Sequence, residues 1–291
     1  MTWLVVGASG QLGRSVCEVL EARGVTLISW DRKHGSASEE NFVSMYVRQI
    51  QPKVIVNCAA WTDVDGAESN EAGAQLINVD AVGYLAEAAK LCGATLVHVS
   101  TDYVFSGNGE VPWDEGDEKH PLSAYGRTKA MGEDMISSIL PERSYIFRTA
   151  WLYSAYRQNF AKTMVRLAMK DSDNVSVVSD QVGQPTSASD LAVQIVDSVL
   201  AEIPFGIYHC TNTGQASWFE FAREIFRLVG ADVSRVEPTR SDLFPRPAKR
   251  PAYSVLGHDK WIGSGVKVMR DWKIALAGAM PAIVSAVKEE V

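Results

Sequence analysis

The stretch Trp3-Leu-Val-Val-Gly7-Ala-Ser-Gly10-Gln-Leu-Gly13 decides the fold, because it reads as an apolar strand, a glycine-rich turn and the start of a helix. Glycines at these positions allow a tight turn and let backbone N–H groups approach a pyrophosphate at the helix N-terminus. A glycine triad alone also occurs in unrelated α/β proteins, so its place between strand and helix carries the prediction. The turn therefore predicts a bound dinucleotide.

The next predicted strand specifies where the adenosine half would lie. Asp31 ends this strand about twenty residues after the turn, where a carboxylate can bind the ribose hydroxyls. Arg32 and Lys33 follow at once and could equally bind a 2′-phosphate. The residues themselves thus leave NADH and NADPH both open.

Working outward, strands alternate with helices and no internal repeat interrupts them. The apolar and helical spacings predict strands at 3–6, 26–30, 54–57, 95–99 and 144–148, and helices at 11–23, 40–50, 72–91, 123–139 and 159–168. Repeated β–α units with right-handed crossovers specify an α/β fold with a doubly wound, Rossmann-like parallel sheet.

This alternation weakens after Val178. The remaining chain predicts helices at 191–200, 218–229 and 273–288, one strand at 206–210, and an arginine- and proline-rich stretch at 245–251. We therefore expect a dinucleotide-binding Rossmann domain over residues 1–178, which holds the catalytic residues. A smaller C-terminal α/β substrate portion would occupy residues 179–291, with the chain crossing between the two.

Composition excludes several classes of protein. The 291 residues include 28 Lys and Arg against 35 Asp and Glu, for a net charge of −7, which argues against nucleic acid as a partner. No apolar run approaches the 18 or so residues of a membrane span. The four cysteines lie far apart, so neither a metal site nor a disulfide framework is predicted. We expect a cytoplasmic protein, and base rates favour a homodimer.

Two further elements predict chemistry at the carboxyl edge of the sheet. Tyr125 and Lys129 lie four residues apart on a predicted helix and so share one face. A lysine cation favours a phenolate, and we expect Lys129 to lower the pKa of Tyr125 from its usual value near 10. Thr101 follows the predicted strand at 95–99, so its hydroxyl should project toward the same ligand.

Together these motifs resemble the dTDP-4-dehydrorhamnose reductase branch of the extended short-chain dehydrogenase/reductase superfamily. The resemblance covers nearly the whole chain. It rests on these motifs: Gly10-Gln-Leu-Gly13, Asn57-Cys-Ala-Ala60, Ser100-Thr-Asp-Tyr-Val-Phe105, Tyr125-Gly-Arg-Thr-Lys129, Arg148-Thr-Ala-Trp151, Asn159-Phe-Ala-Lys162, Asp180-Gln, Gly183-Gln-Pro-Thr186 and Arg250-Pro251.

The resemblance implies a role for each matching residue. Tyr125 would donate the proton to the substrate carbonyl, Lys129 would tune it and bind the nicotinamide ribose, and Thr101 would bind the reacting oxygen. The implied substrate ligands are Thr101, Asp102, Trp151, Asn159 and Arg250. The implied cofactor ligands are Gly7, Gly10, Gln11, Leu12, Gly13, Asp31, Arg32, Ala59, Ala60, Thr62, Tyr125 and Lys129.

The implied reaction is hydride transfer from NAD(P)H, with NADPH slightly preferred, to C4 of the dTDP-linked keto-deoxysugar dTDP-4-dehydro-L-rhamnose. Three alternatives stay open: a 4-ketoreductase for another nucleotide-deoxysugar, a 4-epimerase, and a non-catalytic NADP-binding regulatory subunit. The Gly35–Asn41 segment lacks an aspartate that many relatives carry near the adenine, which leaves the cofactor preference open.

A few other residues have competing interpretations. His98 and His209 lie within predicted strands and are expected to be core histidines. Asn78 matches a helix asparagine of the superfamily, and a structural role is at least as well supported. Arg246, Lys249 and Arg250 would either neutralise a substrate diphosphate or form a solvated loop.

Overall fold

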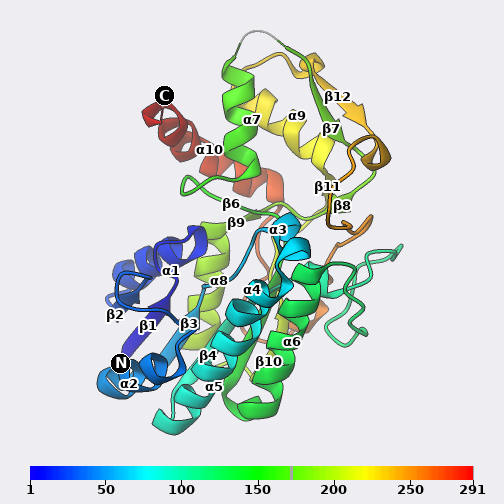
Figure 1. Cartoon of the computed structure of the whole chain (residues 1–291). Helices are drawn as coiled ribbons and strands as arrows, with labels where there is room; N and C mark the ends of the chain where they lie inside the picture. Colours follow the sequence, from blue (N-terminus) through cyan, green and yellow to red (C-terminus); the bar gives the residue numbers. More distant parts are fainter. Residues whose placement is uncertain (171–172, 291) are drawn as a thin grey trace.

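The computed structural model describes residues 1–170 and 173–290. Its centre is a six-stranded parallel sheet in the order β10-β5-β4-β3-β1-β2 (Figure 1). The strands are β1 Thr2–Val6, β2 Thr26–Trp30, β3 Val54–Asn57, β4 Thr95–Thr101, β5 Ser144–Thr149 and β10 Gly206–His209. The predicted doubly wound parallel sheet is therefore confirmed.

Helices cover both faces of the sheet, which explains why its strands are apolar along their whole length. Successive residues of β1 alternate between two cores: Trp3 and Val5 face one, and Leu4 and Val6 face the other. The first core is closed by α1 Gln11–Ala22 and α8 Ala188–Leu200. The second is closed by α2 Glu40–Ile50, α5 Ala81–Cys92 and α6 Ala124–Ile139.

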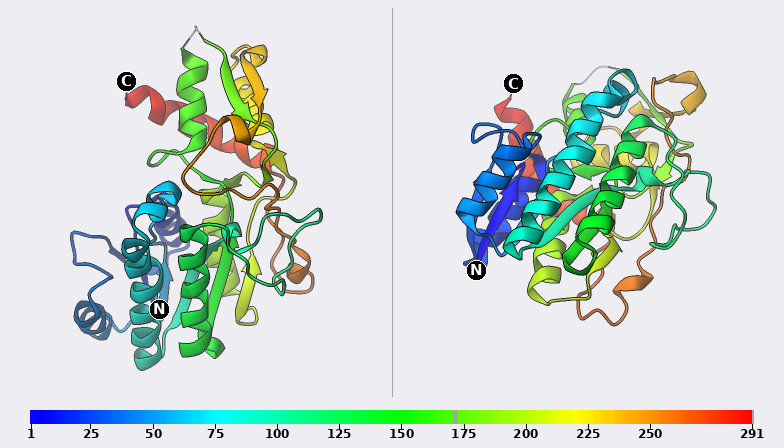
Figure 2. Two further views of the ribbon diagram at one scale, coloured as in Figure 1. Left: turned by 45° about the vertical axis from the view of Figure 1, so that its right-hand side comes forward. Right: turned by 60° about the horizontal axis from the view of Figure 1, so that its bottom comes forward.

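A smaller lobe lies over the carboxyl ends of the sheet strands (Figures 1 and 2). It consists of α7 Phe160–Met169, α9 Trp218–Leu228, α10 Trp272–Glu289 and the paired strands β7 Val175–Val178 and β12 Val236–Thr239. These helices and strands share their own hydrophobic core. Short strand pairs join the lobe to the sheet region: β6 Leu152–Tyr153 with β9 Thr186–Ser187, and β8 Val182–Gly183 with β11 Ala216–Ser217.

The chain crosses repeatedly between these two regions. Helix α7 and strand β7 precede residue 178 yet pack in the smaller lobe. Helix α8 and strand β10 follow it yet pack against α1 and extend the sheet beside β5. A single cut near residue 178 therefore does not separate the two packed regions.

The predicted continuous helix at 72–91 is interrupted. The structure instead has α3 Val64–Ser69, α4 Glu71–Gln75, a π-helical turn at Leu76–Asp80 and then α5. The buried Asn78 in this turn accepts a hydrogen bond from the backbone N–H of Trp61 (2.9 Å) and donates to Thr128 Oγ1 (3.0 Å). These side-chain contacts accompany a local change of helical pitch that apolar spacing does not signal.

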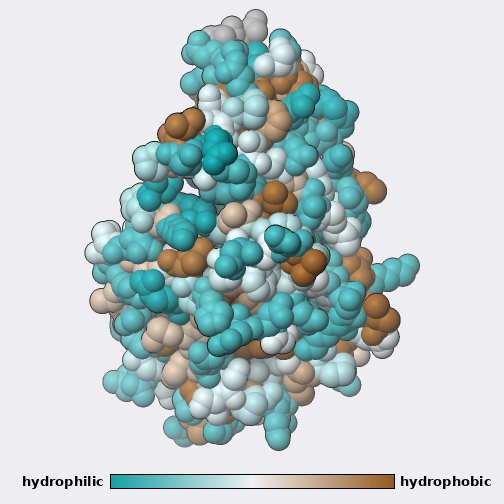
Figure 3. Space-filling view, turned by 90° about the vertical axis from the view of Figure 1, so that its right-hand side faces the viewer, coloured by the Kyte–Doolittle hydropathy of each residue, from teal (hydrophilic) through white to brown (hydrophobic). Residues whose placement is uncertain are grey.

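The acidic segment at 110–120 has the irregular backbone of a loop, yet it is attached to the body of the protein. Trp113 stacks on Phe105 with ring centroids 4.9 Å apart, and the Glu115 carboxylate accepts a hydrogen bond from the His209 backbone N–H. The face shown in Figure 3 is mostly hydrophilic, with separated hydrophobic side chains. Among the described residues, no helix is long and apolar enough to cross a membrane.

Candidate active site

A cavity of about 1150 Å³ lies at the carboxyl ends of the strands, beneath the smaller lobe. This is the edge at which open α/β sheets bind their ligands. The glycine turn, the loops after β2 and β3, the end of β4, the start of α6 and the segment after β5 all contribute to its walls. One cavity thus collects most of the residues that the sequence singled out.

The glycine turn forms a cradle that side chains would fill. Gly7 has a φ of +75°, and a Cβ at this position would lie 2.7 Å from the Ala59 backbone nitrogen. A Cβ at Gly13 would lie 2.2 Å from the carbonyl oxygen of Gly7. The turn therefore packs backbone against backbone and leads directly into α1, as the N-terminal pyrophosphate site of a dinucleotide requires.

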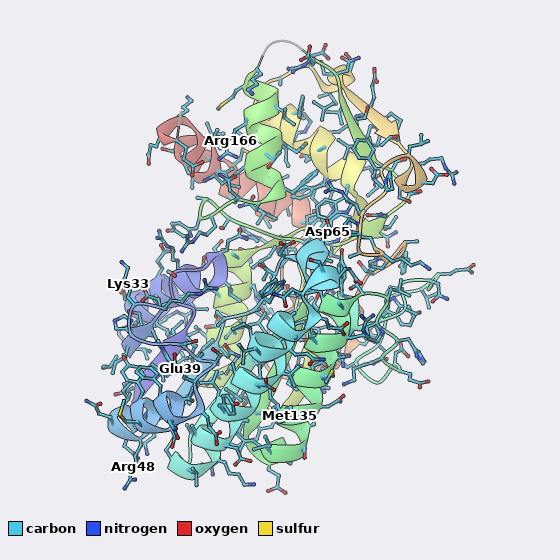
Figure 4. The ribbon with its side chains drawn as sticks, in the orientation of Figure 1. Lys33, Glu39, Arg48, Asp65, Met135 and Arg166 are labelled. Atoms are coloured by element: carbon cyan, nitrogen blue, oxygen red, sulfur yellow. The ribbon has the colours of Figure 1, made fainter. Side chains whose placement is uncertain are left out.

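Residues predicted for the cofactor line the rest of this half of the cavity. Asp31, Arg32 and Lys33 lie at one end, with Gly35, Ser36 and Ala37 of the segment that departs from the family pattern. The Asp31 carboxylate accepts a hydrogen bond from the Lys33 N–H (2.9 Å). Figure 4 shows Lys33, which follows β2, the strand at one edge of the sheet. Ala59, Ala60 and Thr62 line the wall beyond β3.

Thr101, Tyr125 and Lys129 also line this one cavity. Helix α6 starts at Ala124, capped by the Ser123 hydroxyl, which accepts a hydrogen bond from the Gly126 N–H (3.2 Å). This start places Tyr125 in the first turn and Lys129 one turn later on the same face. The Thr101 hydroxyl donates to Asp102 Oδ1 (3.0 Å).

The pKa of Tyr125 moves opposite to our expectation. Burial raises it to about 12, and only the neighbouring Thr101 hydroxyl opposes this increase. Burial also lowers the pKa of Lys129 to about 8. The Lys129 amine is engaged elsewhere, since it donates to the Val99 carbonyl (2.7 Å) and lies 3.0 Å from His98 Nε2. In the cofactor-free protein Tyr125 is therefore a neutral phenol that carries a proton to give.

Asp102 is a buried acid at the wall of the cavity. Burial raises its pKa to about 6. Its Oδ1 accepts the hydrogen bond from Thr101, whereas Oδ2 has no hydrogen-bond partner among the described residues. This oxygen is closed off from solvent, and the Ser254 hydroxyl lies close enough to oppose the increase in the Asp102 pKa.

Trp151 lies on an unusual backbone and faces a second tryptophan. Its φ is +45°, a strained value for an aromatic residue. Strained backbone conformations of this kind cluster at ligand-binding and active sites. Its ring stacks on Trp218 with centroids 3.6 Å apart, and a Cβ at Gly183 would lie 2.6 Å from that indole. Sequence reasoning missed Trp218: the capping box of Ser217 and Glu220 marks a helix start, but nothing local indicates its contact with Trp151.

The remaining two predicted substrate residues have protein partners. Asn159 lines the cavity, caps α7 and donates to Gln11 Oε1 (3.0 Å), so it joins the smaller lobe to the glycine turn. Arg250 forms a bidentate pair with Asp65 of α3 (2.5 and 2.9 Å) and is not one of the residues that line the cavity. Figure 4 shows Asp65 where α3 meets the smaller lobe.

Both histidines expected in the core are indeed fully buried. His98 nevertheless touches Lys129, a link that sequence reasoning missed. Within residues 1–170 and 173–290, no group of three or more His, Cys, Asp or Glu side chains could hold a metal ion.

Three features define the class of this protein: the parallel sheet, the glycine cradle, and the Thr101, Tyr125 and Lys129 side chains in one cavity. It is an NAD(P)H-dependent reductase of the short-chain dehydrogenase/reductase type. More specifically, the family model described as the RmlD substrate binding domain matches residues 1–284, and the chain belongs to this family. Several relatives that are 42–45% identical to this chain are named as reductases of dTDP-linked sugars.

Three similar proteins illustrate the family. A dTDP-4-dehydrorhamnose reductase of Streptomyces griseus is 45% identical over 97% of this chain and 93% of its own length. A probable dTDP-4,6-dihydroxy-2-methyloxan-3-one 4-ketoreductase of Streptomyces antibioticus is 42% identical over 98% of this chain and 97% of its own. The solved dTDP-4-dehydrorhamnose reductase of Bacillus anthracis in complex with NADP is 37% identical, covering 96% and 98%, with a TM-score of 0.92.

Proposed function

We propose that this reductase converts the C4 ketone of dTDP-4-dehydro-L-rhamnose to the alcohol of dTDP-L-rhamnose, with NADPH as the hydride donor. The observation that carries the proposal is the convergence of Thr101, Tyr125 and Lys129 on the cavity that contains the glycine cradle. The name of the Streptomyces griseus relative supports this choice of sugar.

The nicotinamide cofactor, when bound, supplies the hydride to C4. Tyr125 then delivers its phenolic proton to the ketone oxygen, so the carbonyl becomes a CH–OH group and the phenolate regains a proton from solvent. Thr101 binds the same oxygen as negative charge develops on it. Gly7, Gly10, Gln11, Leu12 and Gly13 would hold the pyrophosphate.

The sugar would lie between the end of β4 and the paired tryptophans. Asp102, which lines the cavity, would accept a sugar hydroxyl, and the apolar face of the deoxysugar would lie against Trp151. Asn159 would contribute from the glycine-turn side of the cavity. Arg250 stays a prediction, and contact with the substrate would require it to move from its pair with Asp65.

NADPH is the coenzyme we propose, because Arg32 is exposed at the end of the cavity expected to bind adenosine. A guanidinium there would bind a 2′-phosphate through charge-assisted hydrogen bonds. The NADP complex of the Bacillus anthracis relative agrees with this choice.

A second candidate is reduction of a different dTDP-4-keto-6-deoxysugar. The 42% identity to the Streptomyces antibioticus ketoreductase, over 98% of this chain, favours it specifically. The same cradle and the same three catalytic side chains would serve both substrates, so the sugar-facing residues alone would decide between them. A cytoplasmic homodimer remains a prediction.

The test follows NADPH oxidation at 340 nm with dTDP-4-dehydro-L-rhamnose and, separately, with dTDP-4-keto-6-deoxy-D-glucose. We expect turnover with the first sugar and a loss of about 10²–10⁴-fold in kcat for Tyr125→Phe. Tyr145→Phe is the matched control, since its hydroxyl donates to the Ile203 carbonyl far from the cavity.

Each outcome has a distinct meaning. Turnover of the second sugar alone would replace the rhamnose proposal with the second candidate. A change of sugar configuration without NADPH consumption would indicate an epimerase. Cofactor binding without turnover of either sugar would contradict the enzymatic proposal and favour a regulatory subunit.

A further inference from the structure

His98 connects the cofactor-binding wall to the catalytic lysine. Its side chain is fully buried in β4, three residues before Thr101. Both ring nitrogens have partners: Nδ1 lies 3.1 Å from Asn57 Nδ2, and Nε2 lies 3.0 Å from Lys129 Nζ. The imidazole therefore bridges the end of β3 and the middle of α6.

The direction of this hydrogen-bond chain is fixed at its first link. The backbone N–H of Ala59 can only donate, and Asn57 Oδ1 accepts from it (3.1 Å). The Asn57 amide must then turn its NH₂ group toward His98, so Nδ1 accepts a hydrogen bond and carries no proton. A neutral imidazole in this position bears its proton on Nε2.

This tautomer disfavours the protonated form of Lys129. The Nε2–H points at Nζ, and an ammonium group has no lone pair with which to accept it. A neutral amine accepts from His98 and still donates to the Val99 carbonyl. Burial acts in the same direction, because it lowers the pKa of Lys129 to about 8 and so favours the neutral amine above that pH. Burial, together with the nearby Lys129 charge, holds the pKa of His98 well below its usual value.

Other charged groups near Lys129 do not reverse this arrangement. Glu133, one turn further along α6, favours the charged lysine, but its carboxylate is paired with Arg148 of β5 at 2.9 and 2.8 Å. Lys119 also lies 3.6 Å from Glu133. Tyr125 and Asp102 line the cavity near the Lys129 chain, where Asp102 is buried and Tyr125 partly buried.

We propose that His98 is a positioning residue that disfavours the ammonium form of Lys129 in the cofactor-free protein, through a proton fixed on Nε2 of a neutral ring. The inference rests on the proposed reductase function only in taking Lys129 as a catalytic residue. It assigns His98 a task that the core role expected from the sequence does not include.

The direct test is the tautomer of His98 in the full-length protein without ligands. Long-range ¹H–¹⁵N spectra of ¹⁵N-histidine-labelled protein separate protonated from unprotonated ring nitrogens, and His98→Gln assigns the signals among the five histidines. We expect a neutral ring with the proton on Nε2 at pH 9, where Lys129 is an amine. A proton on Nδ1, or a charged ring at this pH, would overturn the proposal.

A second readout follows the titration of the Lys129 amine by ¹³Cε and ¹⁵Nζ shifts, assigned with Lys129→Arg. In His98→Gln the amide carbonyl can accept from an ammonium, so the midpoint should rise by about one pH unit. His209→Gln is the control, since this equally buried histidine contacts the Gly257 carbonyl instead. An unchanged midpoint in His98→Gln would contradict the proposed role.

Neither measurement needs substrate, so the two proposals fail separately. The expected tautomer without turnover would count against the proposed reductase alone. Turnover with a proton on Nδ1 would count against the role of His98 alone.

Discussion

At the scale of single residues, burial determines which side chains of the site carry a proton. Tyr125 enters the reaction as a phenol because its surroundings disfavour a phenolate. The sequence predicted which residues meet, since Y-x-x-x-K spacing and the end of a strand fix Thr101, Tyr125 and Lys129 geometrically. It could not predict the direction of the Tyr125 shift, because that depends on what surrounds the ring and on where the lysine amine points.

Asp102 offers a test of this reasoning through stability. Its pKa is raised on folding to about 6, so the stability of the wild-type protein is reduced as pH rises from about 4 to 6. Asp102→Asn removes the buried charge and should stabilise the protein by up to about 3 kcal/mol at pH 8, with little gain near pH 3.5. Urea unfolding at both pH values measures this difference.

The same substitution should lower kcat/KM, because an amide NH₂ group in place of an Asp102 carboxylate oxygen cannot accept a hydrogen bond from a sugar hydroxyl. Asp242→Asn, on the exposed surface, is the control for the loss of one negative charge. A stability gain that is equal at both pH values would show that the carboxylate is not the source of the penalty.

Arg32 carries the coenzyme choice. Arg32→Gln removes a guanidinium expected to bind the 2′-phosphate, so the KM for NADPH should rise at least about tenfold while that for NADH changes little. The ratio of kcat/KM for the two coenzymes measures the effect. Arg48→Gln, on the exposed side of α2 (Figure 4), is the matched control. Equal losses with both coenzymes would mean that Arg32 binds something other than the 2′-phosphate.

At the scale of elements, apolar periodicity located the sheet strands and most helices to within a few residues. It failed where a polar side chain reshapes the helix, at Leu76–Asp80. The Asn78 side chain is held by partners 17 and 50 residues away, Trp61 and Thr128, which no local sequence pattern includes. The short strands β6, β8, β9 and β11 were missed for a different reason: two residues are too few to show a period.

Asn78 tests the importance of this turn. Asn78→Ala leaves the backbone N–H and C=O of Trp61 without their buried partner, and we expect a loss of about 2–4 kcal/mol in the free energy of unfolding. The loop at 59–62 should also loosen, which weakens cofactor binding. Asn70→Ala, which removes an exposed helix cap on Gly73, should cost only about 1 kcal/mol. Similar losses for both variants, measured by urea unfolding, would contradict a special role for the π-helical turn.

At the scale of the whole molecule, the catalytic cavity needs both packed regions. The glycine cradle and the catalytic side chains belong to the sheet region, whereas Trp218 and Phe221 reach the cavity from α9 of the smaller lobe. Gln11 ties the two together through Asn159 and Ser154. The sequence indicated two regions and a chain that crosses between them. It could not indicate which elements cross, because this depends on which helices later pack together.

The crossings predict how the protein behaves when it is divided. A fragment of residues 1–178 lacks α8, whose Leu191, Ile195 and Val196 cover one face of the sheet beside α1, and lacks the edge strand β10. It also contains α7 and β7 but lacks their packing partners α9, α10 and β12. We expect this fragment to have weak near-ultraviolet circular dichroism and no cooperative urea transition, because its exposed apolar faces cannot offset chain entropy. A fragment of residues 1–210 restores α8 and β10 and should recover part of the ordered signal. A cooperative transition in the 1–178 fragment would show that it folds alone, and that the later elements only complete a site the first half already builds.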